Sequence, residues 1–95
     1  MDCPSCAKAF DLPAWLDNVG TITPAKKWLW ARCPGCGGSQ EIRLEKGRAL
    51  MGYVDGGPGM VFIPLKSYDQ PGLVARWEGR RAYVSYQGRT WTLRV

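Results

Sequence analysis

The sequence contains no histidine. It therefore lacks an imidazole general base, a Ser–His or Cys–His nucleophilic pair, and the histidine ligand that open catalytic zinc sites commonly use. Its eight Asp and Glu residues are scattered along the chain and form no recognisable acid–base motif. We therefore expect a protein without enzymatic activity.

The chain also lacks any apolar run that could cross a bilayer, which takes about 20 consecutive apolar residues. At its start, Met1 to Pro4 show no basic region followed by an apolar stretch, so no signal peptide is visible. We expect a cytoplasmic protein with no membrane partner. Its 95 residues are too few for a TIM barrel or a doubly wound nucleotide-binding domain, and nothing in the composition implies a small-molecule substrate.

Acidic residues are few relative to basic ones. Thirteen Lys and Arg residues against eight Asp and Glu residues give a formal charge of +5. Residues 1–45 carry five charges of each sign, so residues 46–95 supply the whole excess. A basic segment favours a polyanionic or acidic partner, either nucleic acid or an acidic protein surface. The alternative is that the charge serves solubility only.

Four cysteines stand in two C-x2-C pairs, Cys3–Cys6 and Cys33–Cys36, with 26 residues between them. In a reducing cytoplasm such cysteines are more often metal ligands than disulfide partners. Each C-x2-C turn directs two thiolates at one ion, and two such turns complete a tetrahedral four-sulfur site. Soft thiolates in this geometry favour zinc. Cys3, Cys6, Cys33 and Cys36 are therefore predicted to hold one zinc ion, with two disulfides or four unrelated buried thiols as the alternatives.

The stretch from Cys3 to Pro13 (CPSCAKAFDLP), followed by Trp30 to Gly37 (WARCPGCG), resembles the short bacterial and phage-type four-cysteine zinc ribbons. In these, a CPxC knuckle precedes a phenylalanine, an aliphatic residue and a proline, and a CPxCG knuckle closes the site. The resemblance covers about residues 1–45 and implies a zinc ribbon, a fold that occurs in transcription factors, RNA polymerase subunits, ribosomal proteins, phage regulators and adaptors. A second resemblance, to rubredoxins, implies an iron electron carrier as an alternative. Residues 46–95 resemble no family.

Residues 1–45 are predicted to form one ribbon of three short strands. The expected elements are a strand at 8–12, a helical turn at 13–16 capped by Asp11, a turn at 18–20, and strands at 27–32 and 40–45. Trp15, Trp28 and Trp30 either pack in the interior or stack on bases. Packing is favoured because so small a ribbon needs large side chains to cover its metal.

Residues 46–95 are predicted to form a second, basic β module. Its expected strands are 48–54, 60–65, 73–77, 80–86 and 89–95, joined by a glycine-rich turn at 55–59, a connection at 67–72, and two-residue turns at 78–79 and 87–88. Five short antiparallel strands with sharp turns suggest a small barrel or curled sheet of SH3-like or OB-like outline. The predicted fold class is therefore small all-β.

The last three predicted strands alternate strictly between apolar and polar positions. Apolar residues fill one face, and Arg76, Arg81, Tyr83 and Arg94 lie on the other. With two-residue turns, Arg76 faces Arg81 and Arg81 faces Arg94, so the three arginines form one row. Like charges directly opposite one another destabilise a sheet. The row therefore predicts an anionic partner bound by these four residues; the alternative is a solvated face neutralised by nearby carboxylates.

Together these features predict a non-catalytic zinc-ribbon protein that is regulatory and associates with nucleic acid through its basic β face. The alternative from a different class is a protein-interaction adaptor, or a small phage-type regulator or inhibitor, that docks on an acidic surface of a larger complex. A further alternative is the rubredoxin-like iron carrier. The salt dependence of oligonucleotide binding separates the first two, because it is steep only where arginines contact phosphates.

Overall fold

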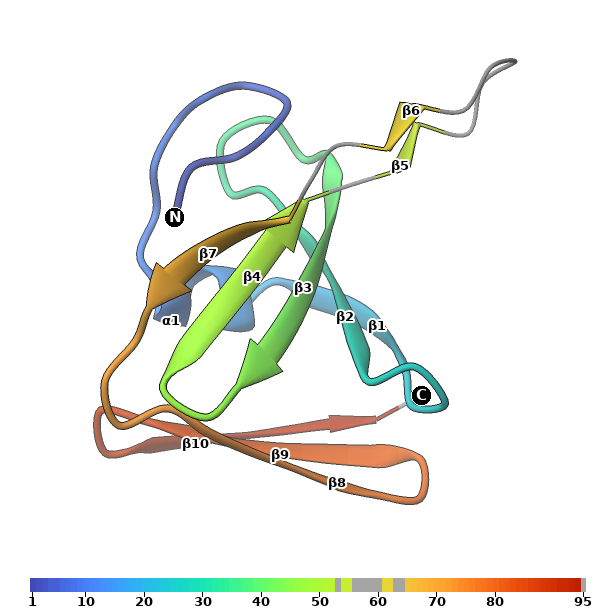
Figure 1. Cartoon of the computed structure of the whole chain (residues 1–95), viewed down its shortest axis with the longest axis vertical. Coiled ribbons are helices and arrows are strands. Elements are labelled where there is room, and N and C mark those ends of the chain that lie inside the picture. Colours follow the sequence, from blue (N-terminus) through green and yellow to red (C-terminus); the bar gives the residue numbers. More distant parts are fainter. Residues whose placement is uncertain (53, 56–60, 63–64, 95) are drawn as a thin grey trace.

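The structure is a computed structural model of the whole chain and describes residues 1–52, 54–55, 61–62 and 65–94; for 54–55 and 61–62 it describes the backbone alone. In this part of the chain the fold is mostly antiparallel β, as predicted, with one short helix. Figure 1 shows a smaller sheet lying across one end of a larger one, with the helix behind the larger sheet. Over the same residues, no helix approaches the length and apolar character of a bilayer span.

The larger sheet has five strands in the order β1-β2-β3-β4-β7. They are β1 (Val19–Thr23), β2 (Trp28–Arg32), β3 (Ser39–Glu45), β4 (Arg48–Gly52) and β7 (Lys66–Asp69). The smaller sheet has three strands in the order β10-β9-β8. They are β8 (Val74–Glu78), β9 (Arg81–Tyr86) and β10 (Arg89–Arg94). The remaining elements are the helix α1 (Leu12–Leu16) and the paired strands β5 (Val54–Asp55) and β6 (Val61–Phe62).

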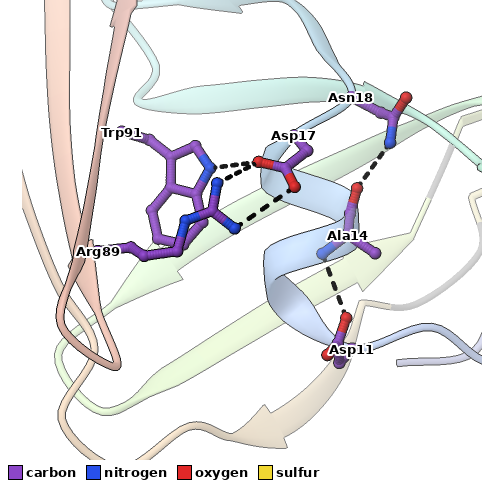
Figure 2. Close-up of polar contacts among 6 residues, drawn as sticks. All are labelled: Asp11, Ala14, Asp17, Asn18, Arg89 and Trp91. Carbon is purple, nitrogen blue, oxygen red and sulfur yellow. Dashed lines mark hydrogen bonds and ion pairs between the residues drawn. The ribbon is translucent and has the colours of Figure 1, made fainter.

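The helical turn predicted at 13–16 is confirmed as α1. Asp11 is its N-cap, and the Asp11 carboxylate accepts a hydrogen bond from the Ala14 backbone N–H at 3.2 Å (Figure 2). Pro13 suits the first turn because an N–H there would have no partner within the helix. The buried residues of α1 are all apolar: Leu12, Trp15 and Leu16. The helix thus delivers large side chains to the core.

Two of the three strands predicted within residues 1–45 are confirmed, as β2 and β3. The third is wrong: only an isolated bridge between Asp2 and Ala9 forms at residues 8–12, and the strand that pairs with β2 is β1. The turn predicted at 18–20 is wrong, since β1 begins at Val19. The β-branched run from Thr21 to Thr23 favours an extended chain. Residues 8–11 instead lead directly into α1, so too few of them remain to form a paired strand.

The larger sheet continues across the predicted boundary between residues 45 and 46. Lys46 and Gly47, the latter at φ +78°, form a tight turn that places Glu45 opposite Arg48. The described part of the strand predicted at 48–54 therefore pairs with β3, and β7 lies where a connection was expected at 67–72 and pairs with β4. The turn at 55–59 and the strand at 60–65 fall partly outside the described residues. The SH3-like or OB-like arrangement and the division at residue 45 stay predictions.

The smaller sheet keeps the predicted faces but not the whole predicted register. Gln87 and Gly88 form the expected two-residue turn, and Arg81 lies opposite Arg94. At the other turn the central residues are Gly79, at φ +58°, and Arg80, instead of residues 78–79. A glycine with positive φ at the first central position is typical of a type II′ hairpin turn. The pairing consequently shifts by two positions, which preserves the faces.

This shift corrects the predicted arginine row. Arg76 lies opposite Tyr83, and Glu78 lies opposite Arg81. The row of three opposed arginines is therefore wrong, and only the Arg81–Arg94 pair remains. The correction reduces the like-charge repulsion expected in this sheet, because the middle arginine has a carboxylate on one side.

Both sheets and α1 bury one common core. Its members occupy alternate strand positions in each sheet, including Leu29, Ala31 and Ile42 in the larger sheet and Ala82, Val84 and Trp91 in the smaller. The inward residues of β9 and β10 are those predicted from the alternation, and their outward neighbours are exposed or half-buried. Removal of this apolar surface from water is the main force that holds the two sheets together.

A polar contact ties α1 to β10 at the edge of this core (Figure 2). The Asp17 carboxylate, at the C-terminal end of α1, accepts hydrogen bonds from the indole N–H of Trp91 at 2.8 Å and from Arg89 Nη2 at 2.8 Å. The Arg89 guanidinium also lies 4.4 Å from the centre of the Trp91 ring. The Trp91 hydrogen bond, followed by Arg89, lowers the pKa of Asp17 below its ordinary value. The contact therefore favours the ionised carboxylate.

Replacing Asp17 with asparagine is expected to lower the melting temperature at neutral pH. A carboxylate whose pKa is lowered in the folded state stabilises that state above its unfolded pKa of about 3.9, and this contribution is lost as the pH falls through the folded pKa. The difference in melting temperature between wild type and Asp17→Asn should therefore shrink below about pH 4. Thermal unfolding followed by circular dichroism across pH measures it. Asp11→Asn is the matched control, because asparagine caps a helix as well as aspartate does; an equal effect of both variants would contradict the assignment.

Candidate metal centre

The two C-x2-C segments form knuckles of the same backbone design. In the first, Ala7 N–H donates to the Cys3 carbonyl at 2.9 Å and Cys3 N–H donates to the Lys8 carbonyl at 2.9 Å. In the second, Gly37 and Gly38 stand where Ala7 and Lys8 stand, with the same two bonds to Cys33 at 2.9 Å each. In both knuckles the chain turns back through a residue in the left-handed backbone conformation, Ala7 at φ +64° and Gly37 at φ +75°. The knuckles are thus equivalent supports for their cysteines.

The four cysteine sulfurs converge in one cluster. All four Sγ atoms lie within 4.8 Å of one another. Cys3 and Cys36 are separated by 3.8 Å, and Cys6 and Cys33 by 3.7 Å, so each pair joins one knuckle to the other. Four sulfurs about 2.3 Å from a central ion would lie about 3.8 Å apart in a tetrahedron, whereas a disulfide needs about 2.05 Å. The cluster therefore fits one metal ion, as predicted, and all four cysteines are free.

The electrostatics of the cluster also suit a cation. Burial raises the pKa of Cys3 to about 12. Burial opposes ionisation of Cys33 too, but backbone N–H groups of Cys36 and Gly35 and the neighbouring thiols outweigh it and lower its pKa to about 7. The Cys33 thiolate thus forms readily, whereas ionisation of the buried Cys3 thiol is unfavourable. A bound cation would make ionisation of the other cysteines favourable, because its positive charge compensates the negative charge of their thiolates.

A buried glutamine supports the first knuckle, and the sequence analysis missed it. Gln40 is 1% exposed and donates through Nε2 to the Ser5 hydroxyl at 3.0 Å. A Cβ added to Gly38 would lie 3.4 Å from Gln40 Nε2 and 3.5 Å from Cys36 Sγ, so these groups crowd one point beside the cluster. The signal available in the sequence is a polar residue at position 40, in phase with the inward Ile42 of the same strand.

The predicted binding residues lie together on the outer face of the smaller sheet. Arg76 is 66% exposed, contacts Glu78 at 3.5 Å, and has its guanidinium 5.1 Å from the centre of the Tyr83 ring. Arg81 and Arg94 are exposed and opposite each other. Val74, 51% exposed, adds an apolar side chain. The structure therefore groups all four predicted residues in two adjacent pairs, Arg76 with Tyr83 and Arg81 with Arg94.

The three tryptophans of the N-terminal half have different environments. Trp15 is fully buried in the core, as predicted. Trp28 and Trp30, on β2, are only half-buried and project from the opposite side of the larger sheet, since Leu29 and Ala31 point inward between them. The packing interpretation is therefore confirmed for Trp15 alone.

The chain matches no protein-family model, no curated protein and no solved structure. Its chemistry is consequently argued from its own residues.

Proposed function

We propose that this protein is a non-catalytic zinc-ribbon protein that associates with nucleic acid through the outer face of its smaller sheet. The observation that carries the proposal is the grouping of the exposed Arg76, Arg81 and Arg94 with the half-buried Tyr83, on a sheet that shares its core with the cysteine knuckles. The knuckles and the core set the position of this face. The arginines supply the charge that a polyanion recognises.

Zinc is the metal we propose for the four cysteines. Four soft thiolate donors that can surround one ion tetrahedrally suit zinc. Four protein ligands also leave no coordination position for a catalytic water. The rubredoxin-like alternative predicts iron in the same ligands. Metal analysis of the purified protein distinguishes them: a colourless protein with one zinc per chain supports the proposal, and a red, redox-active iron protein overturns it in favour of the alternative.

The geometry of the outer face suits phosphates. Arginine presents a planar fork of donors that can hold a phosphate through two hydrogen bonds, which lysine does less well. Arg81 and Arg94 lie side by side, and the remaining pair places a cation beside the aromatic ring of Tyr83. A face with adjacent guanidinium groups and an aromatic ring supplies both phosphate contacts and a stacking surface.

Replacing Arg81 with alanine is expected to weaken binding of a random-sequence oligonucleotide and to reduce the slope of log K against log salt by about 1. Stability should change little, because Arg81 lies between one like charge and one opposite charge. Fluorescence titration at several salt concentrations measures both quantities. Lys8→Ala is the matched control, since it removes an exposed positive charge from the first knuckle instead. Equal slopes for wild type and Arg81→Ala would exclude phosphate contact by this residue.

A protein-interaction role is the second candidate, and the exposed Val74 favours it. An apolar side chain beside basic ones suits an acidic protein surface as well as a phosphate backbone. Absence of oligonucleotide binding even at low salt would support this candidate against the first.

A further inference from the structure

A second group of aromatic and basic side chains lies on the outer side of the larger sheet, and we call it the indole face: Lys26, Trp28, Trp30 and Arg43. Lys26 Nζ lies 4.5 Å from the centre of the Trp28 ring, and the Arg43 guanidinium lies 4.9 Å from it. Trp30 packs edge-on against Trp28, with ring centres 6.1 Å apart. No role in the core accounts for this arrangement, because neither indole belongs to the buried cluster.

The side chains of the indole face are held in place to different degrees. Arg43 pairs with the Glu41 carboxylate at 2.9 Å, and Glu41 is only 3% exposed. The Trp30 indole N–H donates to the Thr23 hydroxyl at 3.2 Å. Lys26 belongs to the exposed turn between β1 and β2, where a flexible side chain can swing off the ring. The face is thus a fixed aromatic platform with one adjustable cation.

A groove lies between the edge strands of the two sheets, with one wall beside the indole face and the other on the outer face of the smaller sheet. It has a volume of about 230 Å³ and runs between the neighbouring edge strands β1 and β10. Thr21 lines one wall, and Thr92 and Arg94 line the other. Thr21 lies opposite Trp30 in the larger sheet, and Arg94 lies opposite Arg81 in the smaller one. The groove therefore lies between Trp30 on β2 and Arg81 on β9, each of which is one strand away from a groove wall.

We propose that these two faces and the groove between them bind single-stranded nucleic acid, with phosphates at Arg81 and Arg94 and a base stacked on Trp28. The inference rests on the proposed nucleic-acid function and adds to it the form of the nucleic acid and the stacking residue. Stacking of a base on an indole is generally stronger than an exposed cation–π contact, so a base can displace Lys26 from the ring. The displaced ammonium then pairs with a phosphate of the same strand.

Single-stranded nucleic acid fits these features better than a duplex or an acidic peptide does. A duplex keeps its bases stacked on one another and offers no exposed ring face to Trp28. An acidic peptide satisfies the cations but leaves the indoles without a partner. The combination of platform, groove and paired arginines therefore selects a ligand that carries anionic and aromatic groups in alternation.

The test compares a short oligothymidylate with an abasic oligomer of the same number of phosphates. Wild-type protein should bind the oligothymidylate more tightly, and Trp28→Ala should reduce that preference roughly 5- to 150-fold. The salt slope should stay unchanged in Trp28→Ala, because no phosphate contact is lost. Trp28→Phe, which keeps a ring, should retain most of the preference, and circular dichroism establishes that each variant is folded. Tyr83→Ala is the comparison variant: it removes the ring beside Arg76 on the outer face of the smaller sheet, so its effect measures how much of the preference arises there.

Each contrary result has a distinct meaning. If Tyr83→Ala abolishes the preference and Trp28→Ala does not, stacking occurs on the smaller sheet, and this inference fails while the proposed function stands. Equal affinity for duplex and single strand, or for oligoglutamate and oligothymidylate, also overturns the inference. If neither oligomer binds at low salt, the proposed function fails, and the inference fails with it.

Discussion

Removing the metal is expected to unfold the N-terminal knuckles and to destabilise the whole chain. A structural zinc site contributes on the order of 10–16 kcal/mol of apparent binding free energy, whereas the net stability of a domain is about 5–15 kcal/mol. Cys3 and Cys33 belong to the common core, so loss of the cluster is felt by both sheets. Excess chelator should therefore abolish the cooperative thermal transition, and added zinc should restore it.

Cys33→Ser is the corresponding variant, because it removes a buried ligand. It should lose stoichiometric metal by elemental analysis and unfold at a markedly lower urea concentration than wild type. Ser5→Ala is its control: this residue bonds to Gln40 beside the cluster but supplies no sulfur, so the protein should keep its metal. A wild-type protein that contains no metal yet unfolds cooperatively, or a disulfide within a knuckle under reducing conditions, would contradict the metal site.

Replacing Trp15 with alanine is expected to cost about 3–5 kcal/mol of unfolding free energy, the usual range for truncation of a buried aromatic residue. Trp15 is 0% exposed, meets Phe10 edge-on at 6.1 Å, and donates its indole N–H to the Met1 carbonyl at 3.3 Å. Alanine would leave a cavity between α1 and the N-terminal segment. Urea unfolding of the metal-loaded protein measures the change in free energy.

Two further substitutions calibrate this prediction. Trp15→Phe keeps most of the volume and loses the hydrogen bond, so it should cost less than Trp15→Ala. Trp28→Ala removes an indole of the same size from a half-buried position and should cost far less than either. If Trp15→Ala and Trp28→Ala lower the unfolding free energy equally, Trp15 does not occupy the packed interior.

The metal site and the sheet faces could be predicted because their signals are local. Spacing within each C-x2-C pair places two sulfurs on one side of a turn, and period-two alternation places Ala82 and Val84 inside while Arg81 and Tyr83 face out. The same alternation could not fix the register between β8 and β9. Shifts of two positions preserve both faces, and only the conformation of Gly79 decides between them.

The strands that the sequence did not predict lack a strong apolar pattern. β7 has the sequence KSYD and buries no residue fully, so no hydrophobic alternation marks it. β1 contains Gly20 directly after Asn18 and Val19, a combination that also occurs in turns. Both lie at the edges of the larger sheet, where pairing on one side only makes smaller demands on the sequence.

Contacts between distant segments were beyond sequence reasoning altogether. The Gln40–Ser5 hydrogen bond depends on how the first knuckle folds back on β3, and the groove depends on how two sheets meet. Nothing near Trp28 in the sequence indicates that Arg43 would reach its ring, because this contact passes between strands. Such placements follow from tertiary packing and not from local propensity.

The contact between Asp17 and Trp91 also orders events during synthesis, because it spans 74 positions. All four cysteines have left the ribosome once residue 36 is free, so the knuckles can assemble while most of the chain is still unmade. The helix α1 cannot make its contact with β10 until residue 91 has emerged from the ribosome. A metal captured early would thus hold the N-terminal segment in shape through the interval in which its apolar helix has no complete cover, the stage at which nascent chains are most exposed to aggregation.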